Sequence, residues 1–580
     1  MPGFSKSFIL FLFFSVVGCV AYGQIGIGVN PPAPSAMLHV QDTAKGLLIP
    51  RMTAAQRINI QNPAEGLMVY QTDTPSGFWY YRSGQWVNTF PSNGGRSTIV
   101  LSDTITNAEA QLKIANEVGP NTEEVRILRC SNLTTVDLSM LTNRLLEVYI
   151  DGNPVLQNVN MGNLTSIDGG IYVNNCPQLT VLDVHSLRSI GQTFSNTVGN
   201  GSYWGISITN TGILDINFPV VKQVVGQINI QNNPSLTNLS MPQLLSGQSI
   251  TISNCPLLAN ASFHALKNLA GFNMFNPAEM AAIDFSSLIT IGGLTLKANQ
   301  LSSVSLPALT TAGQIDISAP QLGSASFPVL QACLNFTVNA ASPLSTVFAP
   351  LLLNSKIQLT GGSLNAVNFN SLQTSTGISI SATAGSGASL AFPALQTVLS
   401  GSSSAMNVSG IGTLSFPLLR KTDGLALSGI SSLSVPLLDT AKYLLEIKNS
   451  PSLSTLLFPA LKKCGGMTIT NCGMTSVSFP AFITTYEYPV TGSLAINSNP
   501  NLTSISWPNL QVCNYGYFEN NKLPSSEVNA LLAKFRTVTV PSGSGSPYLY
   551  LKQIPAAPPT GQGITDKNYL IGLGVYVYTD

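Results

Sequence analysis

Apolar side chains return in pairs along most of the chain, in the pattern φ-x-φ, where φ is apolar and x is mostly polar. A clear copy reads Ile228-Asn-Ile230-Gln-Asn-Asn233. Between residues 125 and 523 the pair occurs eighteen times, and most copies lie 19 to 23 residues apart. Alternation over three residues places both apolar side chains on one face of a strand. A period of this length, kept over most of the chain, indicates a solenoid.

A second apolar landmark, φ-x-x-φ, lies in the latter half of each unit, as in Phe392-Pro-Ala-Leu395 and Trp507-Pro-Asn-Leu510. Its proline cannot continue a helix, and no unit shows an apolar period of 3.6 residues. We therefore predict a mainly β chain that winds as a parallel β-solenoid of about 18 coils of about 22 residues, stacked about 4.8 Å apart.

Short helices are predicted to close both ends of the solenoid. Thr106-Asn-Ala-Glu109 reads as a capping box that opens a helix over residues 108–118. After the last coil, Ser525 is predicted to cap a helix over residues 526–535. The other predicted elements of this C-terminal cap are a strand over residues 548–551, a short helix after Thr565 and a strand over residues 575–578.

The first 23 residues read as a signal peptide. Lys6 precedes an apolar run from Phe8 to Val17, and small residues flank Tyr22 at the two positions that signal peptidases read. The run is shorter than the roughly 20 residues that span a bilayer. We predict cleavage before Gln24 and a chain that is secreted or located at the outer cell surface. In a competing interpretation, Val16-Val17-Gly18-Cys19 is a lipobox and Cys19 carries a lipid anchor.

The predicted organisation has five parts. They are the signal peptide (residues 1–23), an N-terminal module (24–98), a cap with a helix (99–124), the solenoid (125–523) and a C-terminal cap (524–580).

Charged residues are scarce. The 26 Lys and Arg and 25 Asp and Glu make up 9% of the chain, where about 25% is usual for soluble domains. With a net charge of +1 and no basic cluster, the chain lacks the long-range attraction that a nucleic acid partner requires.

The repeat resembles leucine-rich repeats, L-x-x-L-x-L-x-x-N/C-x-L, especially their compact form in receptor L domains and bacterial surface proteins. Val225-x-x-Ile228-x-Ile230-x-x-Asn233 follows the opening of that consensus. The resemblance implies a ladder position whose buried Asn or Cys bonds to the main chain at a turn, and a binding scaffold whose outward side chains choose the partner. The residues at the ladder position are Cys130, Asn153, Cys176, Asn233, Cys255, Asn299, Cys472, Asn499 and Asn521.

Residues 24–98 have a different pattern. Ile25-Gly-Ile-Gly, Asn62-Pro-Ala-Glu-Gly and Tyr80-Tyr-Arg-Ser-Gly-Gln-Trp resemble an N-terminal module of exported proteins from Gram-negative bacteria, some of them fibre-like. The resemblance implies a bacterial surface protein.

Seven cysteines remain after the predicted cleavage. They fall in two columns of the solenoid, and no two occupy adjacent coils of one column, so disulfide geometry is out of reach. We predict buried thiols. Because the chain has no Cys-x-x-Cys and no histidine cluster, we predict neither a metal nor a cofactor.

Catalytic groups are few, and we predict that the protein is not an enzyme. His185 and His264 replace the proline of φ-Pro-x-Leu and read as turn residues. The enzymatic alternative is a polysaccharide lyase or hydrolase with a β-helix fold. Its support is one outward column, Asp137, Asn160, Asp183 and Asn217, which could bind a cation or sugar hydroxyls but equally fits solvated side chains.

Binding is the favoured function. The outward residues of the first three coils are Arg126, Tyr149 and Tyr172, and the two tyrosines are predicted to lie side by side as a flat platform for sugars, or else to shield the sheet. Two long coils carry further aromatic candidates. These are Tyr203 and Trp204 in the first and Tyr486 and Tyr488 in the second.

Together these patterns predict a secreted or cell-surface leucine-rich-repeat protein that binds an extracellular glycan or protein by rigid display of outward side chains. The first alternative is a structural fibre or envelope component assembled through the N-terminal module. The second is the polysaccharide-cleaving enzyme.

Overall fold

The computed structural model describes residues 23–580 except 75, 89–94, 143, 192–204, 341–343, 384–387, 488–489 and 541–546. Residues 1–22 of the predicted signal peptide, with Cys19 among them, therefore lie outside the described residues. The chain divides into two units, Met1–Gly95 and Arg96–Asp580, which are described separately.

The N-terminal unit contains two small sheets. Strands β1 (Ile25–Ile27) and β2 (Leu38–Val40) pair in parallel. The second sheet has the order β3 (Arg51–Met52), β4 (Met68–Gln71), β5 (Gly77–Arg82) and β6 (Gln85–Asn88), beside the short helix α2 (Ala54–Ile58). The guanidinium of Arg57 lies 3.8 Å from the ring centroid of Trp79 and donates to Gln71 Oε1 at 2.8 Å. A cation–π contact and a buried hydrogen bond thus hold α2 on the sheet.

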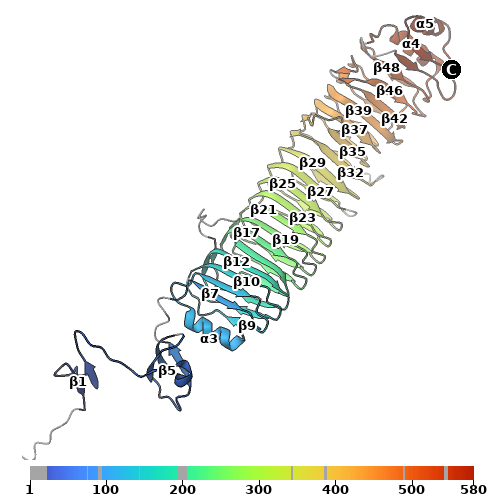
Figure 1. Cartoon of the computed structure of the whole chain (residues 1–580). Helices are drawn as coiled ribbons and strands as arrows, with labels where there is room; N and C mark the ends of the chain where they lie inside the picture. Colours follow the sequence, from blue (N-terminus) through green and yellow to red (C-terminus); the bar gives the residue numbers. More distant parts are fainter. Residues whose placement is uncertain are drawn as a thin grey trace, which may run out of the picture. The chain divides into compact units, whose positions relative to one another are not determined.

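The second unit is a parallel β-solenoid, as predicted. Figure 1 shows its strands stacked from β7 at one end of the array to β48 near the other. One long sheet, the main sheet, receives a strand or strand pair from every coil. All eighteen predicted φ-x-φ pairs fall in or directly beside its strands, and β7, β49 and β50 extend it at the two ends, to about 20 coils.

The strands of the main sheet are β7 (Thr98–Ser102), β8 (Glu124–Leu128), β10 (Leu145–Asp151), β12 (Ser166–Cys176), β14 (Ser189–Ile190), β15 (Gly205–Thr211), β17 (Gln223–Gln231), β19 (Ser246–Ser253), β21 (Asn268–Phe275), β23 (Thr290–Lys297), β25 (Thr311–Ser318), β27 (Ala332–Asn339), β29 (Asn354–Gly361), β31 (Thr374–Ser375), β32 (Ile378–Ala382), β34 (Thr397–Val398), β35 (Met406–Ser409), β37 (Lys421–Ser428), β39 (Thr440–Ser450), β41 (Lys463–Cys464), β42 (Met467–Cys472), β46 (Ser493–Asn497), β48 (Tyr515–Tyr517), β49 (Tyr548–Tyr550) and β50 (Tyr576–Tyr578).

Register on the main sheet follows the alternation of the repeat. Ile228 of β17 pairs with Ile206 of β15 and with Ile250 of β19, so equivalent apolar residues stack directly. These side chains point inward and are at most 1% exposed. The polar residue between each apolar pair points outward, because successive side chains of a strand alternate.

Shorter strands form the second face of the solenoid, in separate parallel sheets. They are β9 (Thr135–Asp137), β11 (Asn158–Asn160) and β13 (Val181–Asp183); β16 (Asp215–Asn217), β18 (Asn238–Ser240), β20 (Asn260–Ser262) and β22 (Ala282–Asp284); β24 (Ser303–Ser305), β26 (Ser324–Ser326), β28 (Thr346–Phe348) and β30 (Ala366–Asn368); β33 (Ser389–Ala391), β36 (Thr413–Ser415) and β38 (Ser432–Ser434); and β40 (Leu456–Leu457), β43 (Ser476–Ser478) and β47 (Ser504–Ser506).

The φ-x-x-φ landmark is a turn that follows each of these short strands. In Phe392-Pro-Ala-Leu395 the Leu395 N–H donates to the Phe392 carbonyl at 3.3 Å. Proline is favoured at the second position of such a turn because its fixed φ suits that position. Both apolar ends point into the core, where Phe392 stacks on Phe416 with ring centroids 5.4 Å apart.

The ladder asparagines bond to the main chain of the preceding coil. Asn153 Oδ1 accepts from the Cys130 N–H at 2.8 Å, and its Nδ2 donates to the Ile127 carbonyl at 2.9 Å. The prediction was wrong at Asn299, which is exposed, while its neighbour Ala298 is buried. The turn there reaches the core one residue earlier, so no polar side chain is needed.

Sequence reasoning missed a second column, directly before the ladder position. Its asparagines adopt the left-handed conformation, with φ of 56° at Asn210 and 53° at Asn232, which Asn tolerates better than most residues. Their side chains join neighbouring coils, since Asn210 Nδ2 donates to Asn175 Oδ1 at 2.9 Å.

Both ends carry helices. At the N-terminal end α3 (Asn107–Glu117) has the predicted capping box of Thr106 and Glu109. At the C-terminal end α4 (Ser525–Phe535) begins after Pro524 without a side-chain cap, so the predicted Ser525 cap was wrong. The last helix, α5 (Gln562–Gly572), begins before Thr565 rather than after it.

All seven cysteines of the described residues are free and buried, which confirms the predicted thiols. In the part of the chain that the structure describes, no helix has the length and apolar character required to cross a membrane.

Candidate functional site

A polar groove lies at the N-terminal end of the solenoid, between α3 and the short strands β9, β11 and β13. Its volume is about 660 Å³, within the range of small-molecule sites. The helix contributes Asn107, Ala108 and Gln111 to its lining. The strands contribute Thr135, Val136, Asp137, Asn158, Val159, Asn160, Val181 and Asp183.

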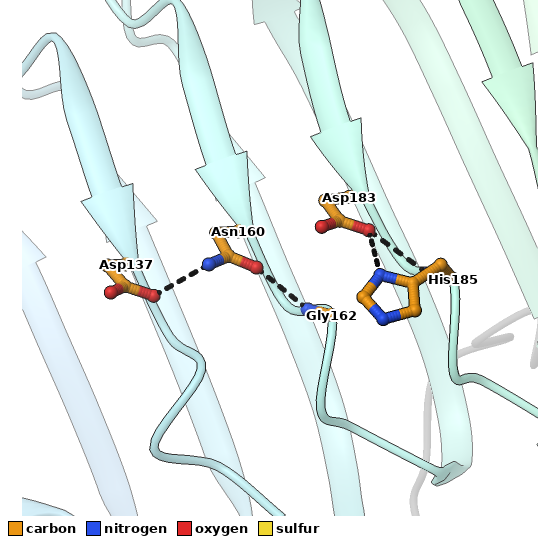
Figure 2. A network of polar contacts seen from close by, with 5 residues as sticks. All are labelled: Asp137, Asn160, Gly162, Asp183 and His185. Atoms are coloured by element: carbon orange, nitrogen blue, oxygen red, sulfur yellow. Dashed lines mark hydrogen bonds and ion pairs between the residues drawn. The ribbon is translucent and has the colours of Figure 1, made fainter.

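Three outward side chains in register form the floor of the groove. Asp137, Asn160 and Asp183 occupy equivalent positions on adjacent strands. Asn160 Nδ2 donates to Asp137 Oδ1 at 3.0 Å, and Asn160 Oδ1 accepts from the Gly162 N–H at 2.9 Å. Figure 2 shows this row of contacts on three successive strands. These bonds hold the carboxylate and the amide in fixed orientations.

His185 extends the row. Its Nδ1 lies 2.7 Å from Asp183 Oδ1 (Figure 2). The ring packs against Gly162, because a Cβ built on that glycine would lie 2.5 Å from His185 Cε1. His185 is the second residue of the turn that Leu187 closes on Val184, so the predicted turn position is confirmed. The glycine thus leaves the space in which the imidazole meets Asp183.

Asn107 holds α3, which forms the wall of the groove opposite the strands. Its Nδ2 donates to Thr134 Oγ1 at 2.7 Å, and its Oδ1 accepts from the Thr134 N–H at 2.8 Å. The first residue of α3 is therefore tied to the strand it faces. Both walls are held by hydrogen bonds within the protein, so binding would cost little ordering entropy.

The groove is suited to hydrogen bonding. Among the described residues, no group of three or more His, Cys, Asp or Glu has the arrangement of a metal site. Asn160 separates the carboxylates of Asp137 and Asp183, which places them two strands, or roughly 10 Å, apart. Asn217, the fourth member of the predicted column, lies in β16 of the next sheet and outside the groove. Amides and carboxylates in this arrangement can bind hydroxyl groups.

The predicted flat surface of Tyr149 and Tyr172 is not formed. Tyr149 pairs with both Arg126 and Tyr172, but the tyrosine rings are 6.1 Å apart and tilted by 43°. A Cβ on Gly170 would lie 2.8 Å from Tyr172 Oη, so that ring folds over the main chain. Burial raises the pKa of Tyr172 to about 12. The pair does not form a shared flat surface and resembles a cover for the sheet.

Arg126 is engaged within the same cluster. Its Nε lies 3.1 Å from Glu124 Oε2, and its Nη2 lies 4.0 Å from Glu147 Oε2. Burial raises the pKa of Glu147, although the Arg126 charge opposes that shift.

The aromatic candidates of the two long coils are not part of a described site. Tyr203, Trp204 and Tyr488 lie outside the described residues. Tyr486 belongs to β44 (Tyr486–Glu487), which pairs antiparallel with β45 (Val490–Thr491).

His264 forms a second histidine contact on this face. Its Nδ1 lies 3.2 Å from Asp284 Oδ2 and 3.0 Å from Ser286 Oγ. A catalytic relay needs the acid on one ring nitrogen and the nucleophile on the other, whereas here a single nitrogen meets both. Burial raises the pKa of Asp284, but hydrogen bonds from Ser286 and His264 outweigh it and leave that pKa below its usual value.

One aromatic cluster was missed by the sequence reasoning. The outward side chains of β49 and β50 and the last residue of β48 are tyrosines, and their rings stack. The signal was a threefold Tyr-x-Tyr, at residues 515–517, 548–550 and 576–578. It went unrecognised because the two later copies were assigned to a cap rather than to further coils.

Comparisons with known proteins match different parts of the chain. Residues 26–106 match the model of a phage tail like trimerisation region. Protein ecm33 of Aspergillus fumigatus is 27% identical over 152 residues, which are 24% of this chain and 38% of that protein. The chain thus spans about two fifths of that relative's length. The crystal structure of a TLR13-ssRNA13 complex is 12% identical, covers 73% of this chain and 85% of that one, and has a TM-score of 0.14, too low to bear on fold or function. The chain is a parallel β-solenoid with a distant curated relative and an N-terminal region similar to a trimerisation module.

Proposed function

We propose that this is an exported surface protein that recognises a hydroxyl-rich ligand, an extracellular glycan, through the polar groove beside α3. The observation that carries the proposal is the row of Asp137, Asn160 and Asp183, which is fixed by hydrogen bonds and lines a groove of about 660 Å³. Sugar hydroxyls both donate and accept, so they pair with carboxylate and amide groups. A rigid solenoid presents such groups at low entropic cost.

Self-association of the chain would raise its apparent affinity for a glycan. The N-terminal unit exposes large apolar side chains, with Leu47 63% and Leu48 78% exposed, and exposed apolar groups gathered in one small unit are typical of an interaction surface. The similarity of residues 26–106 to a trimerisation region fits three chains meeting there. Three linked solenoids would bind a repetitive glycan with avidity.

The second candidate function is a structural fibre or envelope component. The same trimerisation-like region favours it, since assembly alone would then be the role of residues 26–106. This function requires no ligand in the groove, so a binding experiment separates the two.

The test is an array of glycans and extracellular proteins probed with the full exported chain and with a triple variant, Asp137→Ala/Asn160→Ala/Asp183→Ala. A matched control is Ser305→Ala/Ser326→Ala, which changes the equivalent outward positions of β24 and β26. Selective glycan binding that is lost in the triple variant and kept in the control supports recognition by the groove. Absence of binding by the folded, assembled protein supports the structural component.

A further inference from the structure

The last three strands of the main sheet carry an ordered stack of tyrosines. Tyr517, Tyr550 and Tyr578 are in register, with ring centroids 5.2 Å and 4.6 Å apart and planes within 11° of parallel. Beside them, Tyr548 stacks on Tyr576 at 5.0 Å and 17°. The centroid distances match the spacing between strands, so the ring faces look along the axis of the solenoid.

The two columns lie side by side. Within β49 the rings of Tyr548 and Tyr550 are 6.1 Å apart and 15° from parallel. Because Tyr576 and Tyr578 of β50 each stack on one of these rings, they repeat the arrangement one strand further along. Their side chains are 50% and 41% exposed. Among the described residues, β50 pairs with β49 alone. The rings of Tyr576 and Tyr578 therefore form the outermost level of the stack, which we call the tyrosine platform.

The platform is flat, apolar and uncharged. Burial, together with the neighbouring phenols and Glu519, raises the pKa of Tyr550. Flat aromatic faces bind ligands with extended apolar faces. Nucleobases have such faces but carry phosphates with them, and a chain of net charge +1 offers little attraction for phosphate. A pyranose ring with equatorial hydroxyls presents a flat C–H face without charge.

We propose that Tyr576 and Tyr578 form a binding platform for a neutral polysaccharide whose pyranose rings present flat C–H faces, as in a β-1,4-linked glucan. Adjacent sugar rings would lie on the two tyrosines, and outward phenol hydroxyls would bond to their edges. The platform belongs to the coils at the opposite end of the solenoid from the groove (Figure 1). It does not depend on the groove being a binding site.

Protection of the sheet does not account for this stack. The outward residues of the middle strands include Thr295, Asp316 and Thr337, which pair in register without an aromatic cover. Six of the chain's 17 tyrosines fall instead within β48, β49 and β50.

The experiment is a titration of the full chain with cellohexaose, followed by calorimetry and by the ring proton signals of the tyrosines. Tyr576→Ala/Tyr578→Ala is expected to weaken binding about tenfold or more, because both stacking faces are removed. Tyr576→Phe/Tyr578→Phe keeps the faces and should stay within about threefold of the wild type. Tyr569→Ala is the matched control, since Tyr569 is a 46% exposed tyrosine on α5 outside the stack.

Three results would overturn the proposal. One is no cellohexaose binding by the folded wild type. Another is equal binding by the wild type and the Tyr576→Ala/Tyr578→Ala variant, including the case in which the groove triple variant alone loses the sugar. The third is loss of self-association in the tyrosine variant without any sugar binding, which would make the platform a contact between copies. Because the groove variant is titrated in parallel, failure of the platform and failure of the groove are distinguished.

Discussion

Asn233 Oδ1 accepts hydrogen bonds from both the main-chain N–H and the hydroxyl of Thr211, one coil earlier, at 3.0 and 2.7 Å. Its Nδ2 donates to the Ile208 carbonyl of that coil at 2.9 Å. All of these groups are buried, so water cannot replace the asparagine. At this turn, the polar contact between the two coils therefore depends on one side chain.

Asn233→Ala is expected to lower the free energy of unfolding by about 2–3 kcal/mol, since it leaves a buried N–H without its acceptor. Urea unfolding followed by circular dichroism measures the change, and hydrogen exchange at the Thr211 amide localises it. Asn299→Ala is the control, because Asn299 is the exposed asparagine of another coil and should change stability by less than about 0.5 kcal/mol. Equal effects of the two variants would contradict the ladder.

Gly162→Ala is expected to displace the His185 ring, because the added Cβ would lie 2.5 Å from it. The cost should be about 1 kcal/mol or more in the wild type. It should shrink in a His185→Ala background, where the contacts with the ring are absent and Asp183 Oδ2, 2.9 Å from the added Cβ, remains close. A double-mutant cycle of unfolding free energies measures this coupling. Gly293→Ala, which has nothing within 4 Å of the added Cβ, should cost little. Additive effects of Gly162→Ala and His185→Ala would show that the ring does not pack there.

The buried thiols predict a specific dependence on pH. Burial raises the pKa of Cys130, Cys333 and Cys472 from 9.0 to about 11. Between these two values the unfolded chain has lost thiol protons that the folded chain retains, so stability falls as the pH rises from about 9 to about 11. Cys333→Ala should flatten this part of the stability curve. An unchanged slope in the variant, or rapid reaction of native thiols with a disulfide reagent at pH 8, would contradict the burial.

The chain without its predicted signal peptide is expected to form trimers. Sedimentation equilibrium should give about three times the mass of one chain, which is 61.2 kDa for all 580 residues and less once the predicted signal peptide is removed. Leu47→Asp/Leu48→Asp places charges on the exposed apolar residues of the N-terminal unit and should weaken the trimer. Leu334→Asp is the matched control, because Leu334 is a 71% exposed leucine of the solenoid. A monomeric wild type, or an equal effect of both variants, would rule out association through this unit.

Sequence periodicity was sufficient for the fold because each coil repeats the same inward and outward alternation, which the register of Ile206, Ile228 and Ile250 preserves. Asn299 was wrongly assigned to the buried ladder position because the turn in its coil is shorter by one residue, which buries Ala298 instead. Repeat spacing alone does not reveal this difference.

The candidate site was less predictable than the fold, because its shape depends on packing that the repeat spacing does not reveal. The column of Asp137, Asn160 and Asp183 was visible in the repeat, but its groove depends on how α3 packs, which no periodicity specifies. Ring orientation was not predictable either. The pair of Tyr149 and Tyr172 is tilted, whereas the stack that ends at Tyr576 and Tyr578 is flat. Rotamers that depend on neighbours such as Gly170 cannot be read from spacing.

The most direct test of groove recognition is hydrogen–deuterium exchange of the full chain with and without a glycan selected from the array. Ligand should slow exchange in residues 107–111, 135–137, 158–160 and 181–183, which line the groove, and the Asp137→Ala/Asn160→Ala/Asp183→Ala variant should lose that protection. Protection confined to other coils, or glycan binding that changes no exchange rate in these segments, would contradict recognition through the groove.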